Sequence, residues 1–211
     1  MENKKEVYII GASGFGREVA WLIEELDEWK VKGFIDDNEA IIGTKINNIP
    51  VLGTIDFLLD HKDKINAVIA IGNPSVRSKI VDKLKNNSNI DYPNIIAKDV
   101  RISDTCKIGI GNIICTHTVL TVNITLGNFN HINLDCTVGH DVILNNFVTV
   151  YPSVNVSGNV TIGNCSELGT GTQIIQGKKI TDNVIVGAGG VVVKDINESG
   201  TYVGSPVRRI K

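Results

Sequence analysis

The chain has 211 residues, a formal net charge of −2, abundant glycine and few aromatic side chains. This length suits one large domain or two small ones with a real hydrophobic core. The near-neutral charge and the lack of a long basic run argue against general nucleic-acid binding. No apolar stretch is long enough to span a bilayer, and the N-terminus lacks the features of a signal peptide. We therefore expect a soluble, cytoplasmic protein with no membrane partner.

The first part of the chain predicts the start of a nucleotide-binding α/β unit. Residues 6–10 form an apolar strand, residues 11–16 (GASGFG) form a glycine-rich turn, and residues 17–25 form a helix. Ser13 replaces the middle glycine of G-x-G-x-x-G, so the motif alone is weak. Its glycines could instead serve only to pack a helix on a sheet.

Two further strands point to the same edge of a parallel sheet. Residues 31–35 end at the acidic pair Asp36-Asp37, and residues 66–71 end at Gly72. Ligands of open α/β sheets bind where the carboxyl ends of the strands meet, so these loops predict a binding edge. The region is too short for the full six-stranded dinucleotide fold, which argues against a dinucleotide-dependent enzyme.

Charge marks a boundary between two domains, because Lys and Arg become rare between residues 102 and 193. We predict a Rossmann-like nucleotide-binding domain at residues 1–97 and a second domain at residues 98–211. The chain is expected to leave the regular part of the second domain after Val193 and to end in a solvated basic tail.

A strict period of six organises the second domain. Every sixth residue from Ile102 to Val192 is aliphatic, without a missed position. Hexapeptide self-similarity is typical of a β-helix solenoid, in which three units make one triangular coil and residues eighteen apart stack. The aliphatic column, and small or β-branched residues two places before it, should fill the interior. The residue after it should turn the corner, which favours Gly or Asn because they tolerate positive φ.

The whole chain resembles the PglD/NeuD family of bacterial sugar acetyltransferases. The resemblance rests on GASGFGRE, on a solenoid containing Val-Gly-His-Asp, and on the ending Val-Gly-Ser-Pro-Val-Arg-Arg-Ile. It implies an α/β N-terminal Rossmann-like domain followed by a C-terminal left-handed parallel β-helix. It also implies a homotrimer with acetyl-CoA in the groove between neighbouring solenoids.

The family's catalytic pair, a histidine followed by an acid, falls on His140 and Asp141. An imidazole suits a general base in acyl transfer, and the carboxylate would orient the ring and favour its charged form. The alternative is an exposed turn histidine beside a solvating aspartate. Stacking places His140 between Val122 and Gly158, and we infer from this spacing that the glycine leaves room for a ligand.

The family's binding positions fall on both domains. Its acetyl-CoA contacts correspond to Thr149, Gly169, Thr170 and Ala188, and its nucleotide-sugar contacts to Ser13, Gly14, Phe15, Asp36, Asp37 and Gly72. Backbone amides of the glycine-rich turn can hold phosphate, and carboxylates can accept hydrogen bonds from a base or ribose. Relatives that act on UDP-amino-sugars can carry a second histidine in the slot of Thr149. This departure leaves the identity of the sugar open.

Metal chemistry is not expected. The cysteines show no CxxC spacing and are interpreted as buried thiols: Cys106, Cys115, Cys136 and Cys165. A metal-binding solenoid of the γ-carbonic-anhydrase type pairs two histidines five residues apart. Here His117, His131 and His140 are spaced by fourteen and nine residues, and the first two are interpreted as structural or solvated.

The predicted function is acetyl-CoA-dependent acetylation of a sugar by direct transfer with His140 as general base. N-acetylation of a nucleotide-linked amino sugar for bacterial surface glycans is favoured, because the N-terminal domain looks built for a nucleotide. O-acetylation of sialic acid or of another polysaccharide sugar is the alternative. A non-catalytic trimeric scaffold with a nucleotide-sensing head is a more remote one.

Overall fold

A computed structural model describes residues 4–59 and 61–211, so residues 1–3 at the start of the predicted first domain lie outside it. The chain divides into two compact units: residues up to Gly72 with Val76–Ile95, and Asn73–Ser75 with Ile96–Lys211. This division falls two residues before the boundary predicted between residues 97 and 98. Within the described residues, no helix has both the length and the apolar character needed to cross a bilayer.

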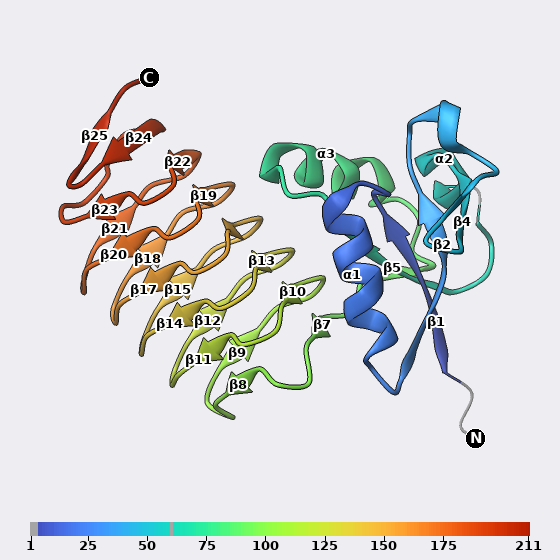
Figure 1. The fold of residues 1–211 in the computed structure, drawn as a ribbon, viewed down its shortest axis with the longest axis horizontal. Coiled ribbons are helices and arrows are strands. Elements are labelled where there is room, and N and C mark those ends of the chain that lie inside the picture. The colour runs from blue at the N-terminus through green and yellow to red at the C-terminus, as the bar shows by residue number, and fades with distance from the viewer. Residues whose placement is uncertain (1–3, 60) are drawn as a thin grey trace. The chain divides into compact units, whose positions relative to one another are not determined.

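The first unit is built on a sheet with the strand order β3-β4-β2-β1-β5-β6 (Figure 1). Its strands are β1 (Lys5–Ile10), β2 (Trp29–Ile35), β3 (Lys45–Ile46), β4 (Ile49–Gly53), β5 (Ile65–Ile69) and β6 (Ile90–Asp91). Its helices are α1 (Gly14–Glu24), the 3-10 helix η1 (Glu39–Ile41), α2 (Ile55–Leu59) and α3 (Pro74–Leu84). β1 pairs in parallel with both β2 and β5. Their carboxyl ends therefore meet at one edge, and the Rossmann-like prediction is confirmed.

The glycine-rich segment differs from its predicted form. Helix α1 begins at Gly14 rather than at residue 17, and Ser13 is its extended N-cap residue. Gly11 has a φ of 104°, a conformation that favours glycine, and a Cβ on Gly16 would collide with the carbonyl oxygen of Gly11. Gly11 and Gly16 therefore pack the helix against the sheet, which is the structural role that the weak motif left open.

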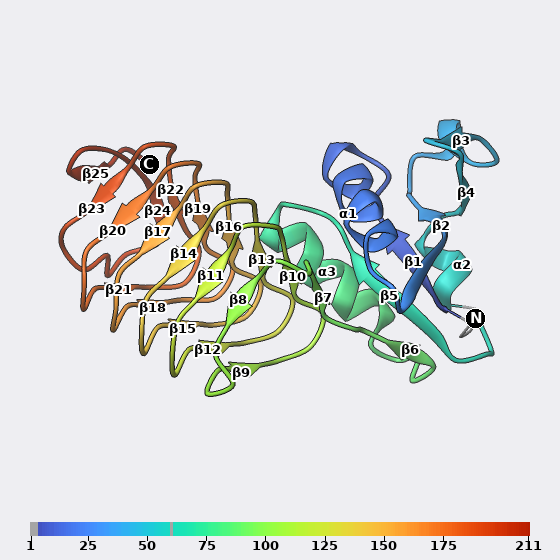
Figure 2. The ribbon, with the colours of Figure 1, turned by 60° about the horizontal axis from the view of Figure 1, so that its bottom comes forward.

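The second unit is a left-handed parallel β-helix whose coils visit the same faces in turn (Figures 1 and 2). One face holds β7 (Ile95–Ile96), β10 (Ile113–Ile114), β13 (His131–Ile132), β16 (Thr149–Val150), β19 (Glu167–Leu168), β22 (Val184–Val186), β24 (Gly200–Gly204) and β25 (Val207–Arg209). A second holds β8 (Arg101–Ile102), β11 (Val119–Leu120), β14 (Thr137–Val138), β17 (Asn155–Val156), β20 (Gln173–Ile174) and β23 (Val191–Val192). A third holds β9 (Lys107–Ile108), β12 (Thr125–Leu126), β15 (Ile143–Leu144), β18 (Thr161–Ile162) and β21 (Lys179–Ile180).

The predicted register of the solenoid is confirmed. Its predicted interior is confirmed from Ile114 onward, whereas in the first coil Ile102 is 36% exposed and Cys106 and Ile108 are only partly buried. Thr137 pairs with Val119 on one side and Asn155 on the other, so residues eighteen apart stack. From Ile114 to Val192 the aliphatic column is at most 2% exposed, and Thr118, Cys136 and the valines two places before the column are fully buried. Backbone ladders between coils and this continuous apolar column hold the coils together.

The position of the corner was predicted wrongly. The left-handed backbone lies three residues after the column, for example at Asp141 (φ 59°), Phe147 (φ 59°) and Asn159 (φ 58°). The glycine directly after the column is needed for a different reason, the close approach of the next coil. A Cβ on Gly139 would lie 2.7 Å from the backbone nitrogen of Gly158.

The C-terminal segment is not a free basic tail. Ile196 is buried and forms an isolated parallel bridge with Ile180, so the third face continues past Val193. Strand β24 then adds to β22 and folds back on β25 as an antiparallel pair. The last coil of a solenoid has no following coil to cover its interior, and this hairpin packs over part of that opening.

Candidate active site

His140 lies at the corner of the solenoid where the chain passes from β14 to β15. Val138, the last residue of β14, points into the interior and is fully buried, and the chain turns immediately afterwards. The side chain of His140 is 48% exposed and that of Asp141 is 45% exposed. Both functional groups therefore lie outside the tube, where a second molecule can reach them.

Asp141 fixes the orientation of the imidazole. Nδ1 of His140 lies 2.8 Å from Oδ2 of Asp141. An ionised carboxylate can only accept hydrogen bonds, so Nδ1 carries the proton and Nε2 of the neutral ring has a free lone pair. Among the described residues, Nε2 has no hydrogen-bond partner. The arrangement presents a base to whatever lies outside this corner.

The Asp141 carboxylate is held in its charged form. Its pKa is lowered from the ordinary value of 3.8, first by the hydrogen bond with His140 and then by a hydrogen bond from Nδ2 of Asn123 at 3.2 Å. A carboxylate with a lowered pKa favours the folded state above its unfolded pKa and loses that contribution as the pH falls through the lowered value. Asp141 is therefore ionised throughout the neutral range.

Gly158 leaves room for the imidazole ring of His140. A Cβ on this residue would lie 2.5 Å from Cε1 of His140 and even closer to Nε2. The prediction that the glycine leaves room for a ligand is therefore wrong, because the imidazole ring fills that space. A side chain at residue 158 would therefore have to displace the ring.

The residues predicted to bind acetyl-CoA lie on a different corner of the same solenoid. Thr170 follows β19 and Ala188 follows β22, and both are exposed. A Cβ on Gly169 would lie 2.6 Å from the backbone nitrogen of Ala188, so this glycine allows the two coils to stack. Thr149 is only 3% exposed. Within one chain, the face of β14 and β17 separates this corner from His140.

The other solenoid histidines differ from His140 in their surroundings. The His117 side chain is 76% exposed, and its Nε2 lies 3.4 Å from Oδ2 of Asp99, which also accepts a hydrogen bond from the His117 backbone. His131 is 1% exposed and pairs in register with Thr149, as stacking predicted. Hydrogen bonds from the Thr116 hydroxyl and the His117 amide lower the pKa of Asp99.

In the first unit, the start of α1 offers unused hydrogen-bonding groups. The Ser13 side chain makes no capping hydrogen bond, although Ser13 occupies the N-cap position. Ser13 and Gly14 are exposed and Phe15 is partly buried. A Cβ on Gly14 would meet only the end of the Arg17 side chain, at 4.0 Å. A hydroxyl without a capping hydrogen bond, together with the backbone amides of a helix N-terminus, suits an anionic group such as phosphate.

The two predicted acidic residues act on the backbone around this loop. Asp36 accepts hydrogen bonds from the Ala12 amide at 2.8 Å and from the Asn38 amide at 2.9 Å. Asp37 accepts from the amide of Ile55, the first residue of α2, at 2.9 Å. Asp36 therefore ties the glycine-rich turn to the end of β2.

Replacing Asp36 by alanine removes at once the side-chain oxygens that accept from the backbone amides of Ala12 and Asn38. Because hydrogen bonds to a charged group contribute more than neutral ones, we expect the free energy of unfolding to fall by about 2–3 kcal/mol. Urea unfolding monitored by tryptophan fluorescence would measure this. Asp63→Ala, at an exposed position of the same unit, should cost less than about 0.5 kcal/mol. Equal losses in the two variants would contradict the structural role of Asp36.

Gly72 marks the third loop at this edge. Its carbonyl oxygen accepts a hydrogen bond from Nη1 of Arg77 at 3.1 Å, and the Ile71 carbonyl accepts from the same atom at 2.7 Å. Arg77, on α3, is fully buried. The sequence analysis missed this residue, since an arginine on a polar helix gives no signal of burial. Arg77 holds the loop after β5 in place.

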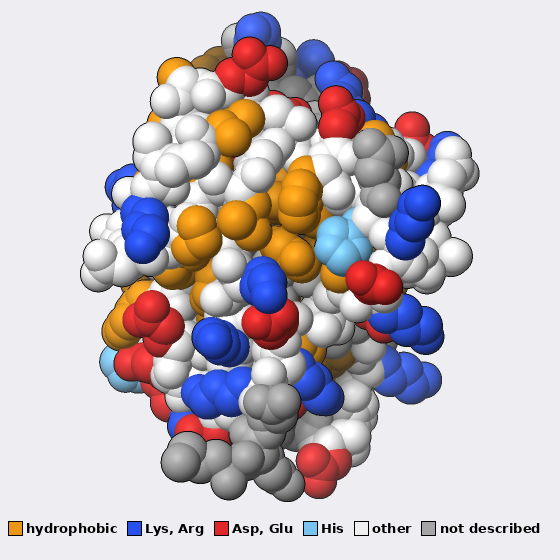
Figure 3. Space-filling view, turned by 90° about the vertical axis from the view of Figure 1, so that its right-hand side faces the viewer, with side chains coloured by type: hydrophobic (Ala, Val, Ile, Leu, Met, Phe, Trp, Pro, Cys, Tyr) orange, Lys and Arg blue, Asp and Glu red, His pale blue; other side chains and the backbone are white. Residues whose placement is uncertain are grey.

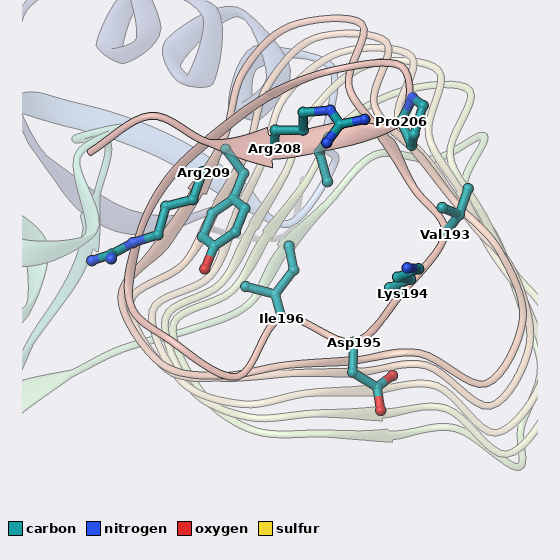
Figure 4. Close-up of a pocket in the computed structure, with 9 residues that line it drawn as sticks. Val193, Lys194, Asp195, Ile196, Pro206, Arg208 and Arg209 are labelled. Carbon is teal, nitrogen blue, oxygen red and sulfur yellow. The ribbon is translucent and has the colours of Figure 1, made fainter.

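Two cavities lie away from the predicted site residues. One, of about 440 Å³, is lined by Glu6, Tyr8, Lys32, His61, Asp63, Lys64, Ile65 and Asn66. On the face of the first unit seen in Figure 3, hydrophobic side chains gather near the centre and charged side chains lie around them. The other, of about 300 Å³, lies at the end of the solenoid, where Ile196 extends into the opening of the last coil (Figure 4). Asp195 and Arg209 point away from that opening.

No metal centre is found in residues 4–59 and 61–211, where no cluster of three or more His, Cys, Asp or Glu side chains is placed to bind an ion. The cysteines are free thiols. Cys115 and Cys136 are buried as expected, whereas Cys106 and Cys165 are partly exposed. Burial raises the pKa of Cys136 to about 11, so this thiol is unreactive at neutral pH.

Comparison with known proteins links both units to enzymes that acetylate sugars. The PglD N-terminal domain family matches residues 6–84. GDP-perosamine N-acetyltransferase of Escherichia coli O157:H7 is 29% identical over 190 residues, which cover 86% of this chain and 82% of that protein.

Solved structures give the same result over the whole chain. The acetyltransferase domain of PglB from Neisseria gonorrhoeae FA1090, in complex with acetyl coenzyme A, matches with a TM-score of 0.91 and 30% identity. The alignment covers 99% of this chain and 100% of that domain. PerB from Caulobacter crescentus, in complex with CoA and GDP-perosamine, matches with a TM-score of 0.88 and 26% identity over 100% of this chain and 99% of that one.

Proposed function

Because the chain belongs to the PglD/NeuD-type family of bacterial sugar acetyltransferases, we propose that it transfers the acetyl group of acetyl-CoA to the amine of a nucleotide-linked amino sugar. The observation that carries the proposal is the His140–Asp141 pair. The Asp141 carboxylate holds Nδ1 of His140. Nε2 of His140 has no hydrogen-bond partner among the described residues and lies on an exposed corner. That is the arrangement a general base requires.

In the proposed reaction His140 takes a proton from the amine. As the amine nitrogen attacks the thioester carbonyl carbon, Nε2 removes its proton, the N–C bond forms and the C–S bond breaks. Asp141 stabilises the resulting imidazolium through Nδ1. The proton on Nε2 is then available to the departing thiolate, so the ring returns to its neutral form. The acetyl group passes directly from the thioester to the amine, and no covalent enzyme intermediate forms.

A homotrimer is part of the proposal. The exposed residues Thr170 and Ala188 lie on one corner of the solenoid, and His140 lies on the next. A second copy that brings its Thr170 corner to the His140 corner of the first would join base and thioester. Light scattering should give three times the 22.8 kDa mass of the chain. A monomer with full activity would contradict this arrangement.

The binding assignments follow the exposure of each group. We assign acetyl-CoA contacts to Thr170, Ala188 and the backbone of Gly169, with buried Thr149 supporting this surface from below. We assign the sugar nucleotide to Ser13, Gly14 and Phe15 at the start of α1, because the Ser13 side chain makes no capping hydrogen bond and a helix N-terminus favours phosphate. Loops carrying Asp36, Asp37 and Gly72 border the same sheet edge, and Asp37 Oδ2 has no hydrogen bond within the described residues.

Thiol release from acetyl-CoA, measured across GDP-, UDP- and CMP-linked sugars, tests the function. Two of the relatives are named for, or bound to, GDP-perosamine, so a GDP-linked amino sugar is the first acceptor to try. We expect turnover with amino sugars and none with the matching sugars that carry hydroxyl groups only. Turnover confined to hydroxyl acceptors, such as sialic acid, would assign O-acetylation. Absence of thiol release with every acceptor would leave a scaffold and remove the proposed activity. A cytoplasmic location and a role in surface glycan synthesis remain predictions.

A further inference from the structure

Within the described residues, the Asp141 carboxylate forms side-chain hydrogen bonds with Asn123 and His140. Nδ2 of Asn123 lies 3.2 Å from Oδ1 of Asp141, and Oδ2 of the same carboxylate bonds the imidazole at 2.8 Å. Each carboxylate oxygen is therefore committed to a different side chain. A carboxylate anchored at both oxygens cannot rotate about its own axis without breaking one of these hydrogen bonds.

The backbone of Asn123 is itself fixed in place. It lies eighteen residues before Asp141, so the two stack at the same position of successive coils. Its φ is 57°, and its amide donates to Oγ1 of Thr105 at 2.9 Å, one coil further down. The Thr105 hydroxyl in turn lies 2.9 Å from Oγ of Ser103. A chain of hydrogen bonds thus runs along this corner from the first coil to the imidazole.

We infer that Asn123 is a positioning residue for the acetyl transfer, an inference that rests on the proposed function. It holds the Asp141 carboxylate so that Oδ2 meets Nδ1 of His140, which keeps the Nε2 lone pair directed toward the acceptor amine. Asn123 does not touch the imidazole in the hydrogen-bond network and needs no contact with substrate. Its effect passes through Asp141.

The chain offers a closely matched control. Asn159 occupies the same corner position in the coil on the other side of Asp141, with a φ of 58° and an exposed side chain. Among the described residues its side chain has no hydrogen bond to Asp141. Glycine adopts this left-handed backbone without strain. Asn123→Gly and Asn159→Gly therefore each remove a side chain and keep the backbone conformation.

Steady-state acetyl transfer and thermal melting of both variants test the inference. We expect Asn123→Gly to lower kcat by about 3- to 10-fold, the factor that one ordinary intramolecular hydrogen bond supports, with KM for acetyl-CoA unchanged. Because the carboxylate is then held by the imidazole alone, the ring is oriented less well, and the loss should appear in kcat alone. Asn159→Gly should leave both kcat and KM as they are. Asn123→Asp, which keeps the shape and loses the donor, should also lower kcat.

The outcomes separate this inference from the proposed function. Equal kcat values for Asn123→Gly and Asn159→Gly, in folded proteins, would overturn the role of Asn123 while leaving the acetyltransferase intact. A loss of kcat together with a raised KM for acetyl-CoA would also overturn it, because such a result indicates a general distortion of the site. No thiol release from the unchanged protein would overturn both proposals.

Discussion

Replacement of His140 by alanine is expected to lower kcat by about 10²- to 10⁴-fold, the range that a general base contributes. The imidazole is exposed and forms its hydrogen bond outside the tube, so its removal opens no interior cavity. The melting temperature and the assembly state should therefore stay the same. Stopped-time assays of thiol release, with saturating acetyl-CoA and amino sugar, would measure the change.

His117 supplies the control for this variant. It also lies on a corner beside a carboxylate, that of Asp99, but on a different edge of the solenoid. Asparagine tolerates its φ of 60°, so His117→Asn removes the ring with little backbone cost. We expect this variant to keep full turnover. Turnover of His140→Ala within a few-fold of the unchanged enzyme would remove the general-base mechanism.

Gly158→Ala is expected to lower kcat by about 10- to 100-fold, because the added methyl group occupies the space of the imidazole. Its Cβ would lie 2.5 Å from Cε1 and 2.8 Å from Cδ2 of His140, so the whole ring must move. A displaced ring loses the 2.8 Å contact with Asp141 and the direction of Nε2. The loss of about one to two powers of ten corresponds to about 1.4–2.7 kcal/mol of transition-state stabilisation.

The backbone at residue 158 does not itself require glycine. The same corner position carries Val122, His140 and Gln176 in neighbouring coils. The loss of stability caused by the added methyl group should therefore disappear when the His140 ring is absent. In a double-mutant cycle on melting free energy, Gly158→Ala should destabilise the unchanged protein and have almost no effect in the His140→Ala background. Additive effects would show that the strain has another source.

Stacking along the solenoid could be predicted from the sequence because it depends on a repeat. The aliphatic residue at every sixth position must face inward, so eighteen residues close one coil and place Val122 and Gly158 beside His140. The same rule places Asn123 beside Asp141, yet Asn123 was not singled out. A corner asparagine is also the ordinary choice for a left-handed backbone, so its second role has no distinct signal.

The predictions that failed depend on side-chain direction and on close packing. Gly158 could equally have made room for a ligand, and only the position of the imidazole shows what fills the space. The left-handed corner lies three residues after the column, a shift that residue preferences alone did not reveal, since Phe147 occupies one such position. The basic tail became a hairpin because the end of the last coil needed cover.

By itself, the sequence determined the two-unit architecture and the coil length, and the family resemblance pointed to the His140–Asp141 pair, because repeats and local motifs can be read along the chain. Only the tertiary structure decided which oxygen of Asp141 meets the ring, that Asp36 holds the amide of Ala12, and that Arg77 lies buried. These contacts join groups from separate elements. Their geometry depends on how those elements pack, and no spacing along the chain encodes it.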